Sequence, residues 1–330
     1  MPQPLISIII PFYNVELYIA VCLESVYNQD ISEDFYEVIC VNDASLDNSR
    51  NIVLEYKMKH RNLTLIEHPV NQKLGAARNT GRSLARGKYI WNVDSDDCIK
   101  PNILKHILDI CEDNNLDVLI FNFDHLILST SKLNKAYPFI NTNVLSGVDF
   151  INKYCQNKFR EISPIWTQIY RTEFLDKNEI YSPPINMGED VPFTLKALLL
   201  SERIMSITDS CYVYRFNETS LGGTIEVIPT AERLYEKCFI CARHVYDIIK
   251  LIPPDESIIK HEITLVCKYI LSLYPKYLNK LELDEVYKFK SLCRYDILRN
   301  KNLYRIMGKR NKIKYFLFLV SLHNLQIQNA

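Results

Sequence analysis

Two glycine-rich phosphate-binding motifs are absent from this chain of 330 residues. No Gly-X-Gly-X-X-Gly follows the first predicted strand, and Gly-X-X-X-X-Gly-Lys-Ser/Thr occurs nowhere in the sequence. Their absence removes the main support for a dinucleotide-dependent oxidoreductase and for a P-loop nucleotide hydrolase. Any nucleotide would therefore have to be held by a different set of side chains.

The sequence also lacks net charge, a cysteine framework and a secretion signal. Its 39 basic and 39 acidic residues balance, so no overall field attracts nucleic acid. The ten cysteines are scattered, and the close pair Cys238 and Cys241 has no second pair to complete a zinc site. We expect reduced, mostly buried thiols in a cytosolic protein. The apolar run at 5–10 is too short to span a bilayer and follows no basic segment, so we expect a buried strand rather than a signal peptide.

An apolar content of 48% is enough for one large α/β domain with an appendage, or for two domains. The predicted strands cover 5–10, 36–41, 63–67, 88–93 and 117–127, and the predicted helices cover 18–26, 45–60, 75–85, 146–155 and 193–200. Strands and helices that alternate at this interval predict right-handed crossovers. The expected fold is α/β, with a Rossmann-like, mostly parallel sheet flanked by helices.

Polar clusters follow three of these strands, at 11–14, 42–43 and 94–97. In a parallel sheet, ligands bind beyond the carboxyl ends of the strands, near the point where the strand order reverses. The three clusters together therefore predict one binding site.

The third cluster places three carboxylates within four residues, at the end of an apolar run. In an extended segment Asp94 and Asp96 share a face, while Asp97 begins the turn out of the strand. Two hard oxygen ligands suit Mg²⁺ or Mn²⁺, whose remaining positions water and a substrate diphosphate would fill. The alternative is an Asx-rich turn that caps the helix opened by Pro101.

Three side chains are candidates for holding a nucleotide. Tyr13 could stack on a base, Asp43 could accept a hydrogen bond from a base or ribose donor, and Arg78, with a metal, could face phosphates. The alternatives are a rim tyrosine for Tyr13 and a helix-entry turn residue for Asp43.

Four ordered segments make the chain resemble the family 2 glycosyltransferases. They read SIIIPFYN at 7–14, VNDAS at 41–45, GAARNTG at 75–81 and GKYIWNVDSDD at 87–97. The match extends more thinly to GEDVPF at 188–193 and to YVYR at 212–215 with Ser220. The family often has a second acid where Asn42 stands and glycine where Ala44 stands. The resemblance implies a GT-A fold and an enzyme that inverts the anomeric centre of a nucleotide sugar.

The resemblance also implies roles for the first half of the chain. Asp96, in the Asp-X-Asp motif, is the expected ligand of Mg²⁺ or Mn²⁺, and Asp94 is expected to contact the ribose or to support the metal shell. The other residues expected to bind the nucleotide sugar are Pro11, Tyr13, Asp43 and Arg78.

In the second half, Asp190 is the expected general base, because inversion by one displacement needs one base and no enzyme nucleophile. Glu189 is expected to support Asp190 or to contact the acceptor. Capping of the predicted helix by these two acids is the alternative for both. Trp166 is a candidate wall of the acceptor site, with a core position as its alternative.

Arg215 is a candidate for acceptor contact or support, in a mobile segment that runs to the paired glycines Gly222 and Gly223. Those glycines predict a lid hinge, with a plain surface loop as the alternative.

We expect a catalytic domain at 1–225 and a helical C-terminal region at 226–330. The region has helical patterns at 231–250, 258–274 and 283–298. Residues 301–314 carry six basic side chains and no acid, and an aromatic-apolar run follows at 315–322. This segment predicts peripheral contact with an anionic membrane surface or, alternatively, a terminal helix docked on the protein itself or on a partner.

The expected function is that of a metal-dependent, inverting glycosyltransferase of the hexosyltransferase type. It would move a sugar from a UDP-sugar to a hydroxyl of a glycan or lipid-linked acceptor in cell-surface polysaccharide synthesis, in the cytoplasm at the inner face of the membrane. The lack of a long transmembrane tract disfavours a processive synthase with its own export channel. The alternatives are a sugar-phosphate nucleotidyltransferase and a non-catalytic binding or scaffold subunit.

Overall fold

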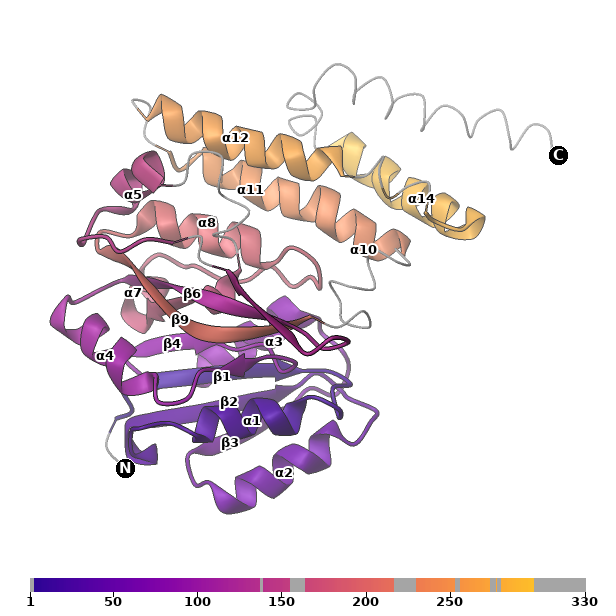
Figure 1. The fold of residues 1–330 in the computed structure, drawn as a ribbon. Coiled ribbons are helices and arrows are strands. Elements are labelled where there is room, and N and C mark those ends of the chain that lie inside the picture. Colours follow the sequence, from indigo (N-terminus) through magenta and orange to yellow (C-terminus); the bar gives the residue numbers. More distant parts are fainter. Residues whose placement is uncertain are drawn as a thin grey trace. The chain divides into compact units, whose positions relative to one another are not determined.

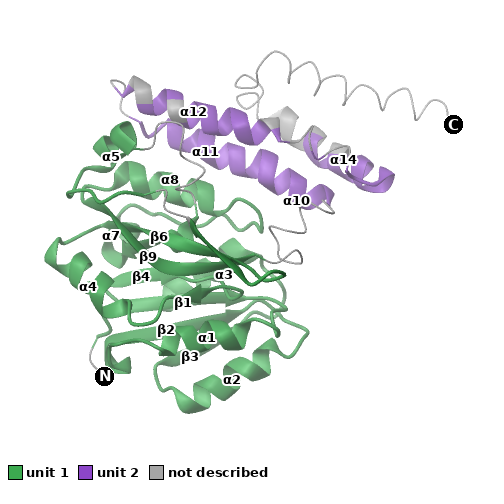
Figure 2. Cartoon of the chain, in the orientation of Figure 1, with its two compact units in different colours: residues 1–220 green, residues 221–330 purple. Residues whose placement is uncertain are grey.

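The structure, a computed structural model, describes residues 3–136, 139–154, 164–216, 230–252, 256–273, 277 and 280–299 (Figure 1). The chain divides into two compact units, Met1–Ser220 and Leu221–Ala330 (Figure 2). The domain boundary predicted between 225 and 226 lies outside the described residues.

The first half of unit 1 has the predicted alternation of strands and helices. Its strands are β1 (Ile6–Phe12), β2 (Tyr36–Asn42), β3 (Leu63–Glu67) and β4 (Tyr89–Asn92), and its helices are α1 (Ile19–Tyr27), α2 (Ser49–Lys59) and α3 (Leu74–Leu84). The four strands run parallel in the order β3-β2-β1-β4. The predicted parallel sheet is therefore confirmed for these strands, and the strand order reverses at β1.

The strands are apolar on both faces because helices cover both faces. Ile6, Ile8 and Ile10 of β1 belong to a core cluster that includes residues of α1, α2 and α4 (Leu104–Asp113). Ile9 points the other way, toward α3, where a Cβ added to Gly81 would lie 2.4 Å from its Cγ2 atom. The missing side chain at Gly81 therefore lets α3 lie close against β1.

The helix predicted from residue 45 begins at Ser49 instead. The Asp47 carboxylate accepts hydrogen bonds from the Ser49 amide (3.0 Å) and hydroxyl (2.5 Å), so Asp47 ends a turn rather than lying in the first helical turn. In the same turn, Ala44 has a φ of 64°, a left-handed conformation that favours the glycine often found there in the family that the sequence resembles.

Beyond β4 the sheet is mixed. The remaining strands are β5 (Cys98–Ile99), β6 (Val118–Ile127), β7 (Lys132–Ala136), β8 (Gln168–Arg171) and β9 (Ile204–Phe216). β8 lies antiparallel between β4 and β6, and β9 runs parallel to β6. The strand predicted at 117–127 is β6, but the sequence analysis did not identify β9, the longest strand described.

A bulge changes the register between β6 and β9. Ile120 pairs with Ser206, but Asn122 pairs with Ser210 and Phe123 with Tyr212. Over this stretch β9 therefore contains three more residues than β6. The Asn122 side chain fills the irregularity by binding the backbone of Phe139 (N, 2.9 Å; O, 3.0 Å) and the carbonyl of Thr208 (3.1 Å). The bulge thus sets which residues of the carboxyl half of β9 face β6 and β5.

The other described α-helices of unit 1 are α5 (Gly147–Tyr154), α7 (Thr172–Lys177) and α8 (Asp190–Leu200). Unit 2 is helical, as the sequence predicts, with α10 (Ala231–Tyr235), a π-helical turn (Glu236–Ile240), α11 (Cys241–Ile249), α12 (Ser257–Ser272) and α14 (Leu283–Arg299). In its core the Cys267 thiol donates to the Ala242 carbonyl oxygen (3.4 Å), which joins α12 to α11.

Among the described helices, none has both the length and the apolar character needed to cross a membrane. The basic and apolar segment at 301–322 lies outside the described residues.

The bulge gives a test of the fold. Asn122→Ala should lower the free energy of unfolding by about 1–3 kcal/mol, because it leaves buried backbone groups without partners. Urea unfolding measures this change. Asn114→Ala is the control, since Asn114 makes one side-chain bond, to the Ile110 carbonyl (3.0 Å), at the end of α4. Equal losses in the two variants would contradict a special role for Asn122.

Candidate active site

The three polar clusters meet at one edge of the sheet, as predicted from the strand pattern. The amide of Asp43, directly after β2, donates to the Phe12 carbonyl at the end of β1 (2.9 Å). The amide of Val93, directly after β4, donates to the Ile9 carbonyl (2.9 Å). These bonds place 11–14, 42–43 and 94–97 side by side at the carboxyl ends of three adjacent parallel strands.

The acidic loop, residues 94–97, forms a tight turn in which the Asp97 amide donates to the Asp94 carbonyl (3.0 Å). Asp97 is fully buried, and Asp94 and Asp96 are half-buried. The loop does not cap the helix after Pro101: α4 begins at Leu104, and the first amides of that helix bind the side-chain oxygen of Gln29. The capping alternative for the Asp-X-Asp motif therefore fails.

Arg78 of α3 joins the acidic loop to the second acidic motif. Its Nη2 atom donates to Asp94 Oδ1 (2.7 Å), and its Nη1 atom donates to Glu189 Oε1 (2.5 Å). Only 3% of the Arg78 side chain and 6% of the Glu189 side chain are exposed, so the carboxylates compensate a charge that water does not reach. Arg78 thereby holds Glu189 and Asp94 in one place, although they are far apart in the sequence.

Two features of α3 allow this contact. A Cβ at Gly75 would lie 1.7 Å from the Pro183 carbonyl oxygen, so only glycine permits the first turn to approach this backbone. The Asn79 side chain exchanges two hydrogen bonds with the backbone of Ser182 (2.8 and 3.0 Å). The sequence Gly-Ala-Ala-Arg-Asn thus docks α3 on the segment before α8 and directs Arg78 at Glu189.

Asp190 is the first residue of α8, beside Glu189, and is half-buried. One of its oxygens accepts the Val191 amide (2.8 Å). Burial raises the pKa of Asp190 and of Glu189, and the nearby Arg78 guanidinium opposes the rise in both. A carboxylate with a raised pKa is a better proton acceptor near neutral pH than an ordinary one.

Asp43 is buried and already has protein partners for both oxygens. Oδ1 lies 2.7 Å from His68 Nδ1 and accepts the Gln72 amide (2.7 Å), and Oδ2 accepts the Lys73 amide (2.9 Å). It therefore orders the segment between β3 and α3. Tyr13, directly after β1, is 44% exposed. Pro11 is buried within β1.

Trp166 and Arg215 are both buried, with 8% and 6% exposure. Trp166 stacks on Tyr212 (centroids 4.5 Å apart) and on Tyr214 (5.5 Å), a placement that favours the core alternative. Arg215, near the end of β9, donates from Nε to the Asp96 carbonyl (2.5 Å). The paired glycines of the predicted hinge lie outside the described residues.

The donor set at the acidic loop fits a hard divalent cation. Within the described residues no side chain donates a hydrogen bond to the Asp96 carboxylate, and none donates to the Oδ2 atom of Asp94. Burial, and then the charge of Asp94, raise the pKa of Asp96 to about 6, so a cation there would relieve an unfavourable carboxylate pair. In the described part of the chain no three His, Cys, Asp or Glu side chains form a closed metal cluster, so water and substrate would supply the other ligands.

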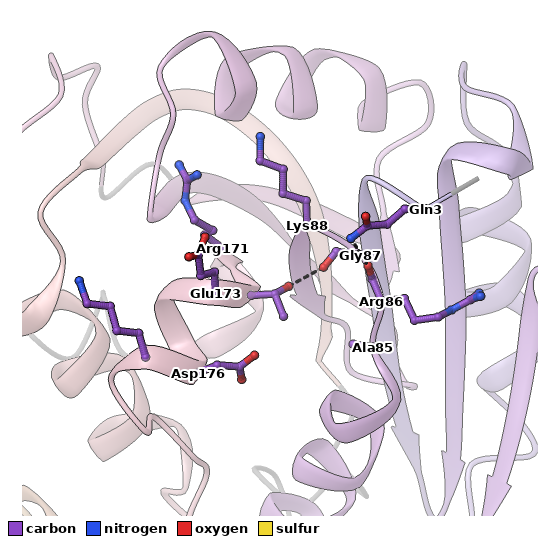
Figure 3. A pocket seen from close by; sticks show the side chains of 10 residues that line it. Gln3, Ala85, Arg86, Gly87, Lys88, Arg171, Glu173 and Asp176 are labelled. Carbon is purple, nitrogen blue, oxygen red and sulfur yellow. Dashed lines mark hydrogen bonds between the residues drawn. The ribbon is translucent and has the colours of Figure 1, made fainter. Parts of the chain in front are cut away.

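A separate hollow opens near the amino end of β4 (Figure 3). It is lined by Gln3, by residues 85–88 and by the start of α7, where the Thr172 hydroxyl donates to the Gly87 carbonyl (2.6 Å). Three of its cations, Arg86, Lys88 and Arg171, pair with the carboxylates of Glu37, Glu112 and Asp117, respectively. The hollow lies at the opposite end of the parallel strands from the acidic loop, so it is not part of the candidate site.

Sequence reasoning did not assign a role in this site to Tyr212, and it did not foresee that Asp97 binds Tyr212. The Tyr212 hydroxyl lies between the Asp94 amide (3.1 Å) and Asp97 Oδ2 (2.8 Å). The alternation in Tyr-Val-Tyr-Arg at 212–215 is a strand signal that could have indicated β9. Nothing in the local sequence indicates that β9 passes the acidic loop.

The chain is similar in sequence to known glycosyltransferases. A family model described as glycosyl transferase family 2 matches residues 7–185. The uncharacterized glycosyltransferase EpsJ of Bacillus subtilis is 34% identical over 221 residues, which are 66% of this chain and 63% of EpsJ. The poly(ribitol-phosphate) beta-N-acetylglucosaminyltransferase TarS of Staphylococcus aureus is 32% identical over 63% of this chain and 35% of TarS. The chain thus matches less than two thirds of the length of either relative.

Solved structures show the same fold. The structure of S. aureus TarS 1–349 in complex with UDP-GlcNAc has a TM-score of 0.70 at 24% identity, over 97% of this chain and 91% of that one. A mannosyltransferase from Pyrobaculum calidifontis in complex with GDP-Man and Mn²⁺ has a TM-score of 0.55 at 19% identity, over 98% and 87% of the two chains. The expected GT-A fold is confirmed by these likenesses.

The docking of α3 gives a test of the site. Gly75→Ala should lower the free energy of unfolding by about 1–3 kcal/mol or more, because the new Cβ meets a backbone carbonyl rather than a movable side chain. Gly81→Ala is the matched control in the same helix, since its Cβ would meet the Ile9 side chain. Urea unfolding should show the larger loss for Gly75→Ala. A larger loss at Gly81 would mean that the segment before α8 moves aside easily.

Proposed function

Because the chain belongs to glycosyl transferase family 2, we propose that it transfers a sugar from a nucleotide sugar, a UDP-sugar, to a hydroxyl group of an acceptor glycan. The observation that carries the proposal is the Arg78 bridge, which brings the acid pair at the start of α8 to the acidic loop. The complex of TarS with UDP-GlcNAc supports a UDP-sugar as donor.

In this proposal Asp190 is the general base. It accepts the proton of the acceptor hydroxyl while the oxygen attacks the anomeric carbon, and the nucleoside diphosphate leaves from the opposite face. A single displacement inverts the anomeric centre and forms no covalent intermediate with the enzyme. The raised pKa of Asp190 matches this role, and Glu189 holds Arg78 beside it.

The donor occupies the carboxyl edge of the sheet. Tyr13 is exposed there and can stack on the base, while Asp43 and Pro11 shape the floor of the base site. Since both Asp43 oxygens already accept protein donors, a contact with the nucleotide would add to these bonds rather than replace them. Asp94 and Asp96 would hold Mg²⁺ or Mn²⁺, which neutralises the charge that develops on the leaving diphosphate.

The proposed acceptor is a cell-surface polymer that carries free hydroxyl groups. TarS, by its name, acts on poly(ribitol-phosphate), and it is one of the relatives that support this class of acceptor. Catalysis is assigned to residues 1–225 and an accessory role to the helical residues 226–330. A cytoplasmic location, with membrane contact through 301–322, stays a prediction because that segment lies outside the described residues.

Binding of UDP tests the donor site. Calorimetric titration with UDP should show binding that Mn²⁺ strengthens, and Asp96→Ala should remove the strengthening by Mn²⁺ because it removes a proposed ligand of the cation. Asp109→Ala is the control, since Asp109 pairs with Lys105 on the surface of α4. Binding of UDP that ignores both Mn²⁺ and Asp96 would contradict the donor-site assignment.

Substitution of the base tests the chemistry. Asp190→Asn should lower kcat for transfer by about 10²–10⁴-fold while the affinity for UDP stays unchanged, because the amide keeps the shape but accepts no proton. Glu202→Gln is a control, at an exposed position after α8. Turnover within a few-fold of wild type would exclude Asp190 as the base. A silent scaffold subunit would show no transfer in either variant or in wild type.

A further inference from the structure

The last part of β9 is attached to the acidic loop more extensively than strand packing requires. Tyr212 and Asp97 are fully buried and Arg215 is 6% exposed, yet all three are polar or charged. Burial of such groups is unfavourable unless their hydrogen bonds are made, and apolar residues could fill the same space at no such cost. The contacts of these three side chains therefore indicate what they hold in place.

The Tyr212 hydroxyl links two members of the loop. It accepts a hydrogen bond from the Asp94 amide (3.1 Å) and donates one to Asp97 Oδ2 (2.8 Å). The other Asp97 oxygen, Oδ1, accepts the Arg215 amide (2.7 Å). The loop is thus tied to β9 at its first and last residues, and each bond polarises the next one.

Arg215 fixes the middle of the loop. Its guanidinium donates from Nε to the Asp96 carbonyl (2.5 Å) and from Nη2 to the Tyr18 carbonyl (3.1 Å), just before α1. The backbone of Asp96 is therefore held, whereas no side chain among the described residues donates a hydrogen bond to its carboxylate. The amide of Asp94 is bound as well, and although its Oδ1 atom accepts Arg78, no donor among the described residues reaches its Oδ2 atom.

We propose that Tyr212, Asp97 and Arg215 are positioning residues that form a clamp on the backbone of the acidic loop and so preset the Asp94 and Asp96 carboxylates for a divalent cation. The identity of the cation's partner, a nucleoside diphosphate, rests on the proposed function. The clamp touches neither the donor nor the cation and acts through the backbone geometry of the loop.

The sharpest variant is Tyr212→Phe, which removes one hydroxyl group and keeps the ring stacked on Trp166. Titration of the protein with Mn²⁺ in the presence of UDP, followed by electron paramagnetic resonance of free Mn²⁺, should show affinity for Mn²⁺ about tenfold weaker than in wild type. Binding of UDP without metal should stay within about twofold.

Tyr89→Phe is the matched control. It removes another buried tyrosine hydroxyl from the same sheet, one that donates to the Cys111 carbonyl (3.0 Å) at the far end of β4. If the hydroxyl of Tyr212 had only a structural role, both variants would lose similar stability and neither would change the affinity for Mn²⁺. The clamp predicts that only Tyr212→Phe weakens Mn²⁺ binding.

Asp97→Asn gives a second variant with a readout that needs no metal. Asp97 uses both oxygens as acceptors, one for the Tyr212 hydroxyl and one for the Arg215 amide. An asparagine side chain has a single acceptor oxygen, so its NH₂ group faces one of these donors and one of the two bonds between the loop and β9 is lost. Amide hydrogen exchange of residues 92–99 in metal-free protein should become faster, while exchange in β2 stays as in wild type.

The outcomes separate the clamp from the donor site. Weaker Mn²⁺ binding in Tyr212→Phe with faster exchange in Asp97→Asn supports the clamp. Unchanged Mn²⁺ affinity in Tyr212→Phe, when wild type binds Mn²⁺ and UDP, overturns the clamp alone. Wild-type protein that binds neither Mn²⁺ nor UDP overturns the proposed function and the clamp with it.

Discussion

The Arg78 guanidinium, buried between Asp94 and Glu189, is the contact on which the arrangement of the site depends. A buried charge is tolerated only where opposite charges and hydrogen bonds compensate it, so α3, the acidic loop and the start of α8 must come together in one way. The bridge also explains the glycine at 75, because a side chain there would hold α3 away from the segment that carries Glu189. The candidate base, Asp190, takes its place from this contact.

The site combines two kinds of carboxylate. Asp97 and Glu189 are buried and accept hydrogen bonds from the protein. Asp97 binds the backbone amide of Arg215, and Glu189 binds the guanidinium of Arg78. Asp94, Asp96 and Asp190 are half-buried, and each has at least one carboxylate oxygen that accepts no hydrogen bond from the described residues. The first kind stabilises the geometry, and the second kind can act on a cation or a proton. This division follows from burial and hydrogen bonding, and not from residue type.

Much of the first half of the fold could be predicted from the sequence. Apolar runs such as that of β1 mark strands buried on both faces, and the polar residues after them mark the edge where parallel strands end. The placement of Asp43 and the acidic loop at the same end of the parallel strands follows from that rule alone. The bridge from Arg78 to Glu189 does not, because it joins residues 111 positions apart through the docking of α3 on irregular backbone.

The second half was harder to predict for a physical reason. β9 pairs with two strands, contains a bulge against β6 and carries polar side chains that satisfy the acidic loop, so its pattern departs from simple alternation. Trp166 could be a wall or a core residue by sequence, and only its stacking on Tyr212 and Tyr214 distinguishes the two. The residues that local patterns fail to explain are those that contact distant segments of the chain.

The most direct test of the central contact is a double-mutant cycle on Asp94→Asn and Glu189→Gln, with urea unfolding as the measurement. Each single variant leaves Arg78 paired with one carboxylate, whereas the double variant leaves a buried charge without either. The bridge predicts that the double variant loses more stability than the sum of the singles, by about 0.5–3 kcal/mol. Losses that add to within about 0.5 kcal/mol would contradict the claim that Arg78 couples the two acidic motifs.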